Sequence, residues 1–567
     1  MVKVAGFSSL FTLVVVVGSF GCGGAPPEPA DLMVRGGTII TMDQNQPEAE
    51  ALAARGQTIV AVGTEAELRS LMGPDTEVID LDGATAVPGL IEAHGHFLSM
   101  GWAKMQLDLG AASNWQEIVG MVADAAAGAE PGEWIFGRGW HQEKWDEPPV
   151  PSLDGLPLHD ELSRVSPDNP VLLTHASGHA AIANAVAMEM AGINEGTLDP
   201  AGGEIVRDSK GRPIGVLRET AEELVSIIAD QQPSEATLHR MTELAAEECL
   251  VNGITSFQDA GTSFERVAFL QSLAESSELD VRLWIMLSDD NQTLAERLPG
   301  FGVYRAGDEY LTVGGIKRWV DGALGSHGAW LLEPYTDLTT STGLNIVTPA
   351  ELRESARLAA EFRLQLCSHA IGDRANRETL DVYEEALGTV PDGRERRWRI
   401  EHAQHLDRAD IGRFAELGVV AAMQPIHCAS DGPWVQLRLG EQRALQGAYV
   451  WRDLLGSGAV IASGTDVPVE DVDPIANFHA AVTRQSPDGS VFYPDQRMTR
   501  MEALRSMTRD AAWAAFEEDR KGALEVGKLA DITVLSLNPL TVPEKEIRQT
   551  EILVTVVGGE IRYRARP

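Results

Sequence analysis

Two histidines separated by a single residue end an apolar run and have the spacing of metal ligands. His94 and His96 close the stretch VPGLIEAHGH at residues 87–96. Alternate side chains of a β-strand lie on the same face, so both imidazoles would point the same way. Neutral imidazole is a common ligand of divalent metal ions. An isolated pair of this kind is more often two ordinary histidines, so a metal site requires further ligands elsewhere in the chain.

Such residues follow, each at or near the end of another apolar run. Lys317 lies within residues 311–321, His369 ends 364–369, His402 ends 398–402, and Asp466 follows 459–464. Taken singly, each has an ordinary interpretation, such as a buried histidine, a surface lysine or an aspartate in a turn. Their joint occurrence at strand ends favours metal chemistry, because imidazole and carboxylate groups are typical zinc ligands.

The strands that would position these residues alternate with helical stretches, which is typical of a parallel sheet or barrel. Eight strand candidates occur, namely a run that ends at His94 and residues 253–259, 281–286, 311–321, 364–369, 398–402, 419–424 and 459–464. Eight parallel strands close a (β/α)8 TIM barrel, whose active site lies at the carboxyl ends of the strands. We therefore predict an α/β fold with such a barrel over residues 87–519.

Both ends of the chain and one long interval lie outside this repeating pattern. Residues 31–86 and 520–567 are rich in short strand-like runs, and together they predict one small β-sandwich domain built from both termini. The interval between the first two barrel strands is far longer than one crossover helix requires and is rich in Gly, Pro and Trp. We predict an inserted subdomain there, at about residues 105–245, over the mouth of the barrel.

The first residues have the pattern of an export signal. Lys3 precedes an apolar stretch at residues 7–17 that is too short to span a bilayer, and Cys22 follows at the position of a lipidated cysteine. We predict a lipoprotein signal peptide at residues 1–21 and a Gly/Pro-rich tether at 22–30. The chain would then be exported and anchored to the membrane through Cys22, facing the periplasm or the cell exterior. The alternative is an ordinary secretory signal that is cleaved nearby.

Composition limits the classes of partner. The 567 residues carry a formal net charge of −38, which would repel the phosphate backbone of a nucleic acid. The hydrophobic content of 44% is ordinary for a globular protein. We expect a small-molecule substrate and no nucleic-acid ligand.

The sequence motifs around the ligand-type residues resemble those of the metal-dependent amidohydrolase superfamily, and more narrowly its YtcJ-like group, amidohydrolase family 3. The matching motifs are SGH (177–179), GIKRWVDGALGS (315–326), HAIGD (369–373), EHAQ (401–404), QPIH (424–427), GTDVPV (464–469) and GKLAD (527–531). The resemblance extends from about residue 31 to the end, and the relatives include N-substituted formamide deformylases. One departure is His141, which stands where relatives usually carry Asp.

This resemblance implies a site with two divalent metal ions. One metal would be held by His94, His96 and Asp466, the other by His369 and His402, with a carboxylated Lys317 bridging them. Zn²⁺ suits these ligands best, and Fe²⁺ or Mn²⁺ would also fit. A hydroxide shared by the metals would be the nucleophile. Asp466 would be the catalytic acid and base that takes its proton and passes it to the leaving nitrogen.

Three further residues are candidates for substrate binding. His179, His427 and Asp321 could orient or polarise a substrate carbonyl, although loop hydrogen bonding or helix capping is an equally ordinary role for each. The resulting hypothesis is a metal-dependent hydrolase of a C–N bond in an amide, N-formyl or cyclic amide compound. The alternatives are a lyase or isomerase on the same barrel and a binding protein without catalysis. The complete ligand set argues against the last alternative.

Overall fold

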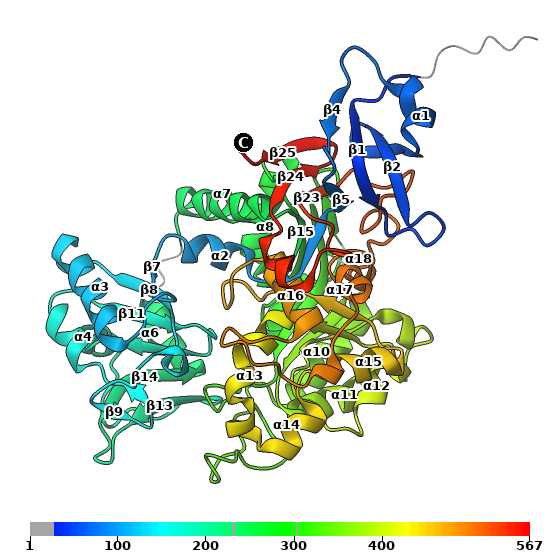
Figure 1. The fold of residues 1–567 in the computed structure, drawn as a ribbon. Coiled ribbons are helices and arrows are strands. Elements are labelled where there is room, and N and C mark those ends of the chain that lie inside the picture. The colour runs from blue at the N-terminus through cyan, green and yellow to red at the C-terminus, as the bar shows by residue number, and fades with distance from the viewer. Residues whose placement is uncertain (1–27, 230–232, 302–303, 567) are drawn as a thin grey trace, which may run out of the picture.

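The computed structural model describes residues 28–229, 233–301 and 304–566, and a parallel barrel lies at its centre (Figure 1). The barrel strands, in their hydrogen-bonded order, are β6 (Leu90–Gly95), β15 (Ile254–Thr262), β16 (Arg282–Leu287), β18 (Leu311–Trp319), β19 (Gln365–Ala370), β20 (Arg399–His402), β21 (Val420–Met423) and β22 (Ile461–Ser463). Short β17 (Tyr304–Ala306) pairs antiparallel with β18. The predicted TIM barrel and its strands are confirmed.

The first and last strands meet through the segment that follows β22. The Asp466 amide donates to the His94 carbonyl at 2.7 Å, and the His96 amide donates to the Val467 carbonyl at 2.8 Å. Buried Glu92 adds to this closure, because its Oε1 accepts from the Thr465 amide at 2.7 Å and its Oε2 from the Thr465 hydroxyl at 2.9 Å. The segment that carries Asp466 is thereby fixed against the strand that carries His94.

Helices cover the outside of the barrel, as parallel strands that are buried on both faces require. They are α2 (Phe97–Ala103), α7 (Glu235–Val251), α8 (Phe264–Glu275), α9 (Asn291–Arg297), α10 (Pro349–Phe362), α11 (Asp373–Leu387), α12 (Ile411–Leu417), α13 (Pro425–Leu439), α14 (Glu441–Gly447), α15 (Trp451–Ser457), α16 (Pro474–Thr483), α17 (Arg500–Ser506) and α18 (Arg509–Ala514). Every residue of β6, β16 and β19 is buried. Helix α10 shows how the sequence sets a boundary: Thr348 and Glu351 form a capping box around Pro349 at its start.

Strands from both termini form one further sheet. Its members are β1 (Leu32–Ile40), β2 (Glu48–Arg55), β3 (Thr58–Gly63), β4 (Glu77–Asp80), β5 (Thr85–Pro88), β23 (Ile532–Leu535), β24 (Ile552–Val557) and β25 (Glu560–Arg564), with α1 (Glu65–Leu68) beside them. The two parts join where β23 pairs with β5. The sheet branches at β1, whose first half pairs with β4 and whose second half pairs with β5. One apolar core includes Val34 and Ile79 from the N-terminal part and Val534 from the C-terminal part.

The long interval after β6 and α2 forms a separate lobe, seen on the left of Figure 1. Its sheet has the order β13 (Gly203–Arg207), β14 (Pro213–Glu219), β12 (Ala180–Ala183), β11 (Val171–His175), β8 (Ile135–Trp140) and β7 (Leu107–Asp108). Its other elements are α3 (Trp115–Gly128), β9 (Ser152–Leu153), β10 (Leu156–Pro157), α4 (Asp160–Val165), α5 (Ala185–Met190) and α6 (Glu223–Ala229). The lobe has its own core, in which Trp115, Ile118 and Trp140 are buried.

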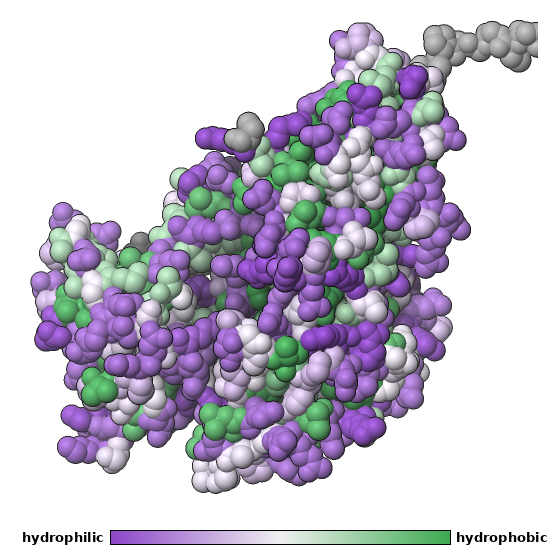
Figure 2. Space-filling model, in the orientation of Figure 1, coloured by the Kyte–Doolittle hydropathy of each residue, from purple (hydrophilic) through white to green (hydrophobic). Residues whose placement is uncertain are grey.

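The visible surface is mostly hydrophilic, with scattered apolar side chains, in keeping with the acidic composition (Figure 2). Among the described residues, no helix combines the length and apolar character that crossing a membrane requires. The predicted signal peptide at residues 1–21, the lipidation site Cys22 and residues 22–27 of the predicted tether lie outside the described residues.

Candidate metal centre

Ligand-type side chains converge at the carboxyl ends of the barrel strands. His94 belongs to β6, His369 to β19 and His402 to β20, while His96 and Asp466 follow β6 and β22. All five ring or carboxyl groups are buried except that of His96, whose side chain is 25% exposed. The His369 and His402 ring centroids are 4.4 Å apart, although register pairs His369 with Glu401 and His402 with Ala370. Strand alternation alone would put the two rings on opposite faces, and the left-handed backbone of His402 (φ 75°) ends that alternation.

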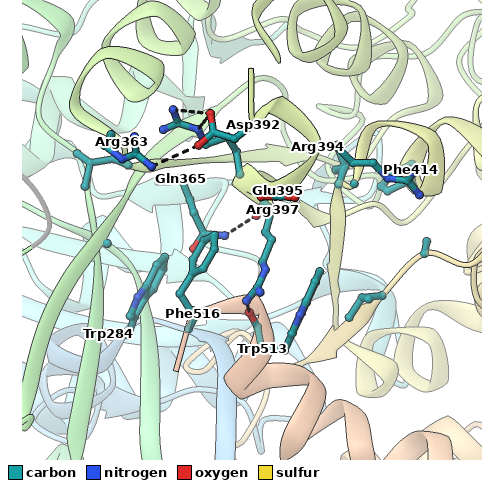
Figure 3. Close-up of a pocket in the computed structure, with 18 of the residues that line it drawn as sticks. Trp284, Arg363, Gln365, Asp392, Arg394, Glu395, Arg397, Phe414, Trp513 and Phe516 are labelled. Carbon is teal, nitrogen blue, oxygen red and sulfur yellow. Dashed lines mark hydrogen bonds and ion pairs between the residues drawn. The ribbon is translucent and has the colours of Figure 1, made fainter. Parts of the chain in front are cut away.

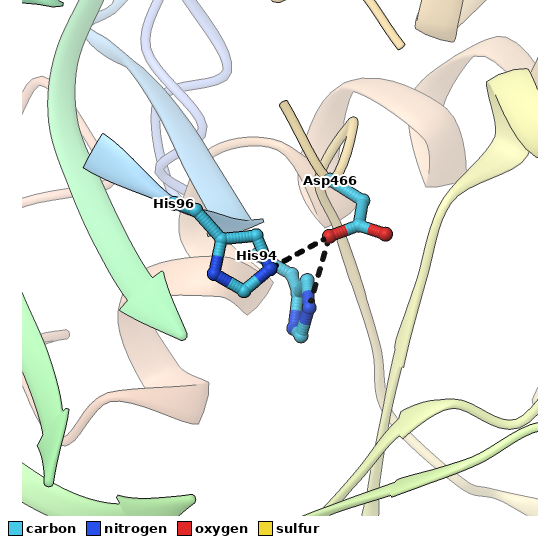
Figure 4. A group of neighbouring side chains, drawn as sticks. All are labelled: His94, His96 and Asp466. Atoms are coloured by element: carbon cyan, nitrogen blue, oxygen red, sulfur yellow. Dashed lines mark ion pairs between the residues drawn. The ribbon is translucent and has the colours of Figure 1, made fainter. Parts of the chain in front are cut away.

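The first group of three consists of His94, His96 and Asp466 (Figure 4). Asp466 Oδ1 lies 3.4 Å from His94 Nε2 and 3.2 Å from His96 Nε2. Their ligand atoms all lie within 4.8 Å of one another, which suits a single cation. These are the three residues expected to share one metal.

A second group consists of His402, His427 and Asp466. His427 comes from α13, the helix that follows β21, and its Nε2 lies 4.0 Å from Asp466 Oδ2. The sequence-based expectation paired His402 with His369 and gave His427 to the substrate. In the structure His369 packs on the His402 ring, and its Nε2 lies 3.6 Å from Asp321 Oδ1. His427 is therefore a further candidate ligand, and its role as a substrate contact stays a prediction.

Lys317 lies beneath these groups, completely buried in the barrel, with Nζ 3.5 Å from His94 Nε2. Burial lowers the pKa of Lys317, although the negative charges of Glu401 and Asp466 oppose this effect. A lowered pKa increases the fraction of neutral amine, which is the form that reacts with carbon dioxide to give a carbamate.

The donor atoms have the electronic character that a divalent cation needs. Burial lowers the pKa of His96 and brings the pKa values of His369 and His402 well below the ordinary value, which keeps the imidazoles neutral. Burial would raise the pKa of Asp466, but its contacts with His94 and His96 outweigh this and lower the pKa well below its usual range. An ionised carboxylate beside neutral imidazoles is a typical donor set for Zn²⁺.

Several of these buried atoms also lack hydrogen-bond partners. Within the described residues, Asp466 Oδ1, His369 Nε2 and His427 Nε2 make no hydrogen bond. Buried polar atoms without partners are costly and rare in folded proteins, and a bound ion can satisfy such atoms. The residues present therefore fit a bound metal.

A buried pair of charged residues orients His94. Glu401 Oε2 forms a short contact with His94 Nδ1, which leaves Nε2 directed at Asp466. Arg399 holds the same carboxylate, with Nε 2.8 Å from Oε1 and Nη2 3.0 Å from Oε2. Partners of this kind fix the tautomer and the orientation of a ligand histidine. The sequence analysis did not identify either residue. A usable signal was present, because Arg399 and Glu401 are opposite charges two positions apart in a strand that was expected to be buried.

His402 is oriented in a similar way. Its Nδ1 lies 2.8 Å from Gln424 Oε1, which directs Nε2 toward the site.

Both His402 (φ 75°) and Asp466 (φ 62°) have left-handed backbone conformations, which are uncommon for residues other than glycine. Such strain persists only where the surrounding structure imposes it, and it is frequent at functional sites.

The inserted lobe contributes His179 to the same region. The ring centroids of His179 and His369 are 4.9 Å apart, and His179 Nδ1 lies 2.8 Å from Glu219 Oε2. Burial opposes charge on His179, but the negative charge and hydrogen bond of Glu219 outweigh it and raise the pKa. Glu219 was not foreseen, since its contact with His179 depends on the antiparallel pairing of β14 with β12 within the lobe.

Asp321 lies beside His369 and makes several backbone hydrogen bonds, and its predicted substrate contact stays a prediction. Its carboxylate is completely buried and accepts backbone N–H groups from Trp330 (2.8 Å), Ile371 (2.9 Å) and Gly372 (2.8 Å). Both of its oxygens are thus used in fixing the loops after β18 and β19. The structure gives Asp321 a visible role in holding these loops.

The cavity above the metal ligands is enclosed by both the barrel and the lobe. It is lined by His369, His402, His427 and Asp466 on the barrel side and by His141, His175 and His179 from the lobe. Two ion pairs join lobe and barrel here, Lys144 with Glu470 at 3.3 Å and Glu143 with Arg438 at 2.9 Å. His141, the departure noted in the sequence, is therefore a wall of the pocket.

Comparisons with known proteins agree with this geometry. A family model described as "Amidohydrolase family" matches residues 77–563. Protein LONG AFTER FAR-RED 3 of Arabidopsis thaliana is 35% identical over 94% of this chain and 92% of its own length. The putative amidohydrolase YtcJ of Bacillus subtilis (strain 168) is 31% identical, covering 93% and 98%. The N-substituted formamide deformylase of Arthrobacter pascens is 28% identical, covering 94% and 98%.

Two solved structures are also similar. An uncharacterized metal-dependent hydrolase from Pyrococcus furiosus superposes with a TM-score of 0.70 at 28% identity, over 90% of this chain and 100% of the other. An uncharacterized metal-dependent hydrolase from Pyrococcus horikoshii OT3 gives a TM-score of 0.72 at 26% identity, over 91% and 99%.

Proposed function

The chain belongs to the amidohydrolase family, and on that premise we propose that this metal-dependent hydrolase cleaves a carbon–nitrogen bond in an amide, N-formyl or cyclic amide substrate. The observation that supports it most strongly is the cluster of imidazoles around Asp466 at the barrel mouth. Burial lowers the pKa values of His96 and His402, while the pKa of Asp466 is well below its usual range. The name of the Arthrobacter pascens relative, a deformylase of N-substituted formamides, supports the choice of bond.

The ligand residues are His94, His96 and Asp466 for one cation, and His402 with His427 or His369 for a second. When bound, Zn²⁺, Fe²⁺ or Mn²⁺ supplies Lewis acidity that polarises a carbonyl and lowers the pKa of water. Lys317, whose lowered pKa favours the neutral amine, would bridge the two positions after carboxylation.

Asp466 moves the proton in this proposal. Its lowered pKa keeps the carboxylate ionised, so it can accept a proton from the attacking water and return it to the leaving nitrogen. His427 Nε2 lies 4.0 Å from Asp466 Oδ2.

His179 binds and orients the carbonyl. Because Nδ1 is held by Glu219, only Nε2 is free to donate a hydrogen bond toward the substrate. The raised pKa of His179 favours the protonated ring, which strengthens such a bond to a carbonyl oxygen that gains negative charge. The enclosing lobe would reduce access of bulk water and strengthen these interactions.

The test is an activity screen of the purified chain loaded with Zn²⁺, Mn²⁺ or Fe²⁺. N-formyl amines, N-acyl amines and lactams are offered, and release of amine or opening of the ring is measured. We expect turnover of at least one class, abolished by a chelator and restored by metal. Turnover of esters or of C–C bond substrates alone, by protein with full metal content, would contradict the proposal.

We also propose that the chain is exported and held at the membrane by a lipid on Cys22, from its N-terminal sequence. The Cys22→Ser variant should lose the acyl mass at its N-terminus and leave the membrane fraction or remain unprocessed. A wild-type chain that is soluble and cleaved after another residue would contradict the anchor.

A further inference from the structure

A second cavity lies at the end of the barrel where the strands begin, opposite the metal ligands. Figure 3 shows side chains that line it. It encloses about 860 Å³ and opens where several strands begin, with Thr312 from β18 and Gln365 from β19 in its wall. Val419 and Val460, which directly precede β21 and β22, complete that wall. The volume is within the range of small-molecule sites in proteins, roughly 300–1,000 Å³.

The cavity concentrates positive charge in an acidic protein. Five arginines line it, Arg305, Arg363, Arg394, Arg396 and Arg397, against two carboxylates, Asp392 and Glu395. Asp392 is shared between Arg363 at 3.3 Å and Arg396 at 3.0 Å, and Arg397 pairs with Glu518 at 2.7 Å. Within the described residues no ion pair joins Arg305 or Arg394 to a carboxylate. Guanidinium groups left over in this way favour an anionic ligand.

Aromatic side chains form a further part of the surface. Trp284, Phe414, Trp513 and Phe516 line the cavity. The guanidinium of Arg397 lies between two of them, 4.0 Å from the Trp513 ring centroid and 4.2 Å from that of Phe516. Phe516 is 43% exposed and has a left-handed backbone (φ 58°), an unusual conformation for a bulky residue. An exposed ring held in this way offers a flat face to a ligand.

A buried hydrogen-bond acceptor lies in the same wall. Gln365 is 2% exposed, and its Nε2 donates to the carbonyl of Ala514 at 2.9 Å and to that of Arg397. Its Oε1 has no hydrogen-bond partner among the described residues. Buried side-chain acceptors are rarely left without a partner, so this oxygen is suited to a donor on a bound molecule.

We propose that this cavity is a second binding site, for a small aromatic anion that carries a hydrogen-bond donor. The guanidinium of Arg394 binds the anion, the aromatic side chains pack against its ring, and Gln365 Oε1 accepts from its donor. The site is at the other end of the barrel from the metal ligands, and its existence does not depend on the reaction proposed above.

The test is isothermal titration calorimetry of the metal-loaded full chain with 4-hydroxybenzenesulfonate. A sulfonate is a poor metal ligand, so binding at the metal centre is disfavoured. Methanesulfonate supplies the anion without the ring, and phenol supplies the ring and donor without the anion. We expect both to bind at least about tenfold more weakly than the aromatic sulfonate. Equal affinity for methanesulfonate, or no binding of the aromatic sulfonate up to about 10 mM, would overturn the proposal.

Variants locate the binding. Arg394→Glu and Phe516→Ser should each weaken binding at least about tenfold, because they reverse the free charge and remove the exposed ring. Arg240→Glu is the matched control, since Arg240 is a surface arginine on α7 that pairs with Glu243 at 3.0 Å. Unchanged affinity in both test variants, with folding verified by circular dichroism, would show that the probe binds elsewhere.

Discussion

The buried contact between Glu401 and His94 allows the sharpest test of the site. In Glu401→Gln the side chain keeps its size but loses its charge. If the new amide oxygen faces Arg399, its NH₂ group faces His94 Nδ1, which must then accept, and the ring proton moves to Nε2. If the oxygen instead faces His94, the NH₂ group faces the donors of Arg399. In the first orientation His94 Nε2 carries the proton and cannot bind a metal, and in the second Arg399 loses an acceptor.

The size of each effect depends on whether His94 or Arg399 loses its hydrogen-bond partner. Loss of the partner that orients a ligand histidine typically weakens metal binding about 10- to 100-fold, which is about 1.4–2.7 kcal/mol. Leaving the completely buried Arg399 without its counter-charge costs about 3–5 kcal/mol of folding free energy. Both losses are expected in part, since the two orientations compete.

The assay is a chelator-competition titration for metal affinity together with urea unfolding of the metal-free chain. Glu518→Gln is the matched control, because it breaks a carboxylate–arginine pair with Arg397, just before β20, that does not touch His94. A loss of stability in Glu401→Gln with metal affinity unchanged would refute the orienting role. That result would mean that Glu401 stabilises the fold through its ion pair with Arg399 and does not affect metal binding.

The stability effect should also depend on pH. Burial would raise the pKa of Glu401, but Arg399 and His94 outweigh it, and the folded-state pKa lies below the usual value of roughly 4.3. A lowered pKa contributes stability that is fully present above the unfolded-state pKa and is lost as the pH falls toward the folded-state value. The stability difference between wild type and Glu401→Gln should therefore narrow below about pH 4.

Three further outcomes are expected. Asp466→Asn, at full metal occupancy, should lower kcat by roughly 10²–10⁴-fold if Asp466 moves the proton, and a near-normal kcat would rule this out. Lys317→Ala should lose one metal by elemental analysis and most of the activity, with partial rescue by short carboxylic acids; full activity would exclude a bridging role. Glu219→Gln removes the charge that raises the pKa of His179, so kcat/KM should begin to fall at a lower pH while metal content stays constant. An unchanged pH profile would show that protonated His179 is not required.

The sequence by itself determined the barrel and most of the candidate ligands. The eight strand runs, the location of His94, His369 and His402 at strand ends and the β-strands of both termini are local properties of the chain. Local patterns suffice here because the two-residue repeat of a strand fixes which side chains share a face, and parallel barrel strands align their carboxyl ends at one edge.

The tertiary structure alone decided which groups meet. Glu401 contacts His94 across a separation of 307 residues, and that contact exists only because the barrel brings β20 close to β6. Asp321 lies 3.6 Å from His369 and also accepts backbone amides from two loops, and only the fold brings those amides to it. His427 approaches Asp466 because α13 begins directly after β21, and the position of a helix relative to a neighbouring strand end depends on packing. The sequence separation of two such segments does not indicate how close they lie in the folded protein.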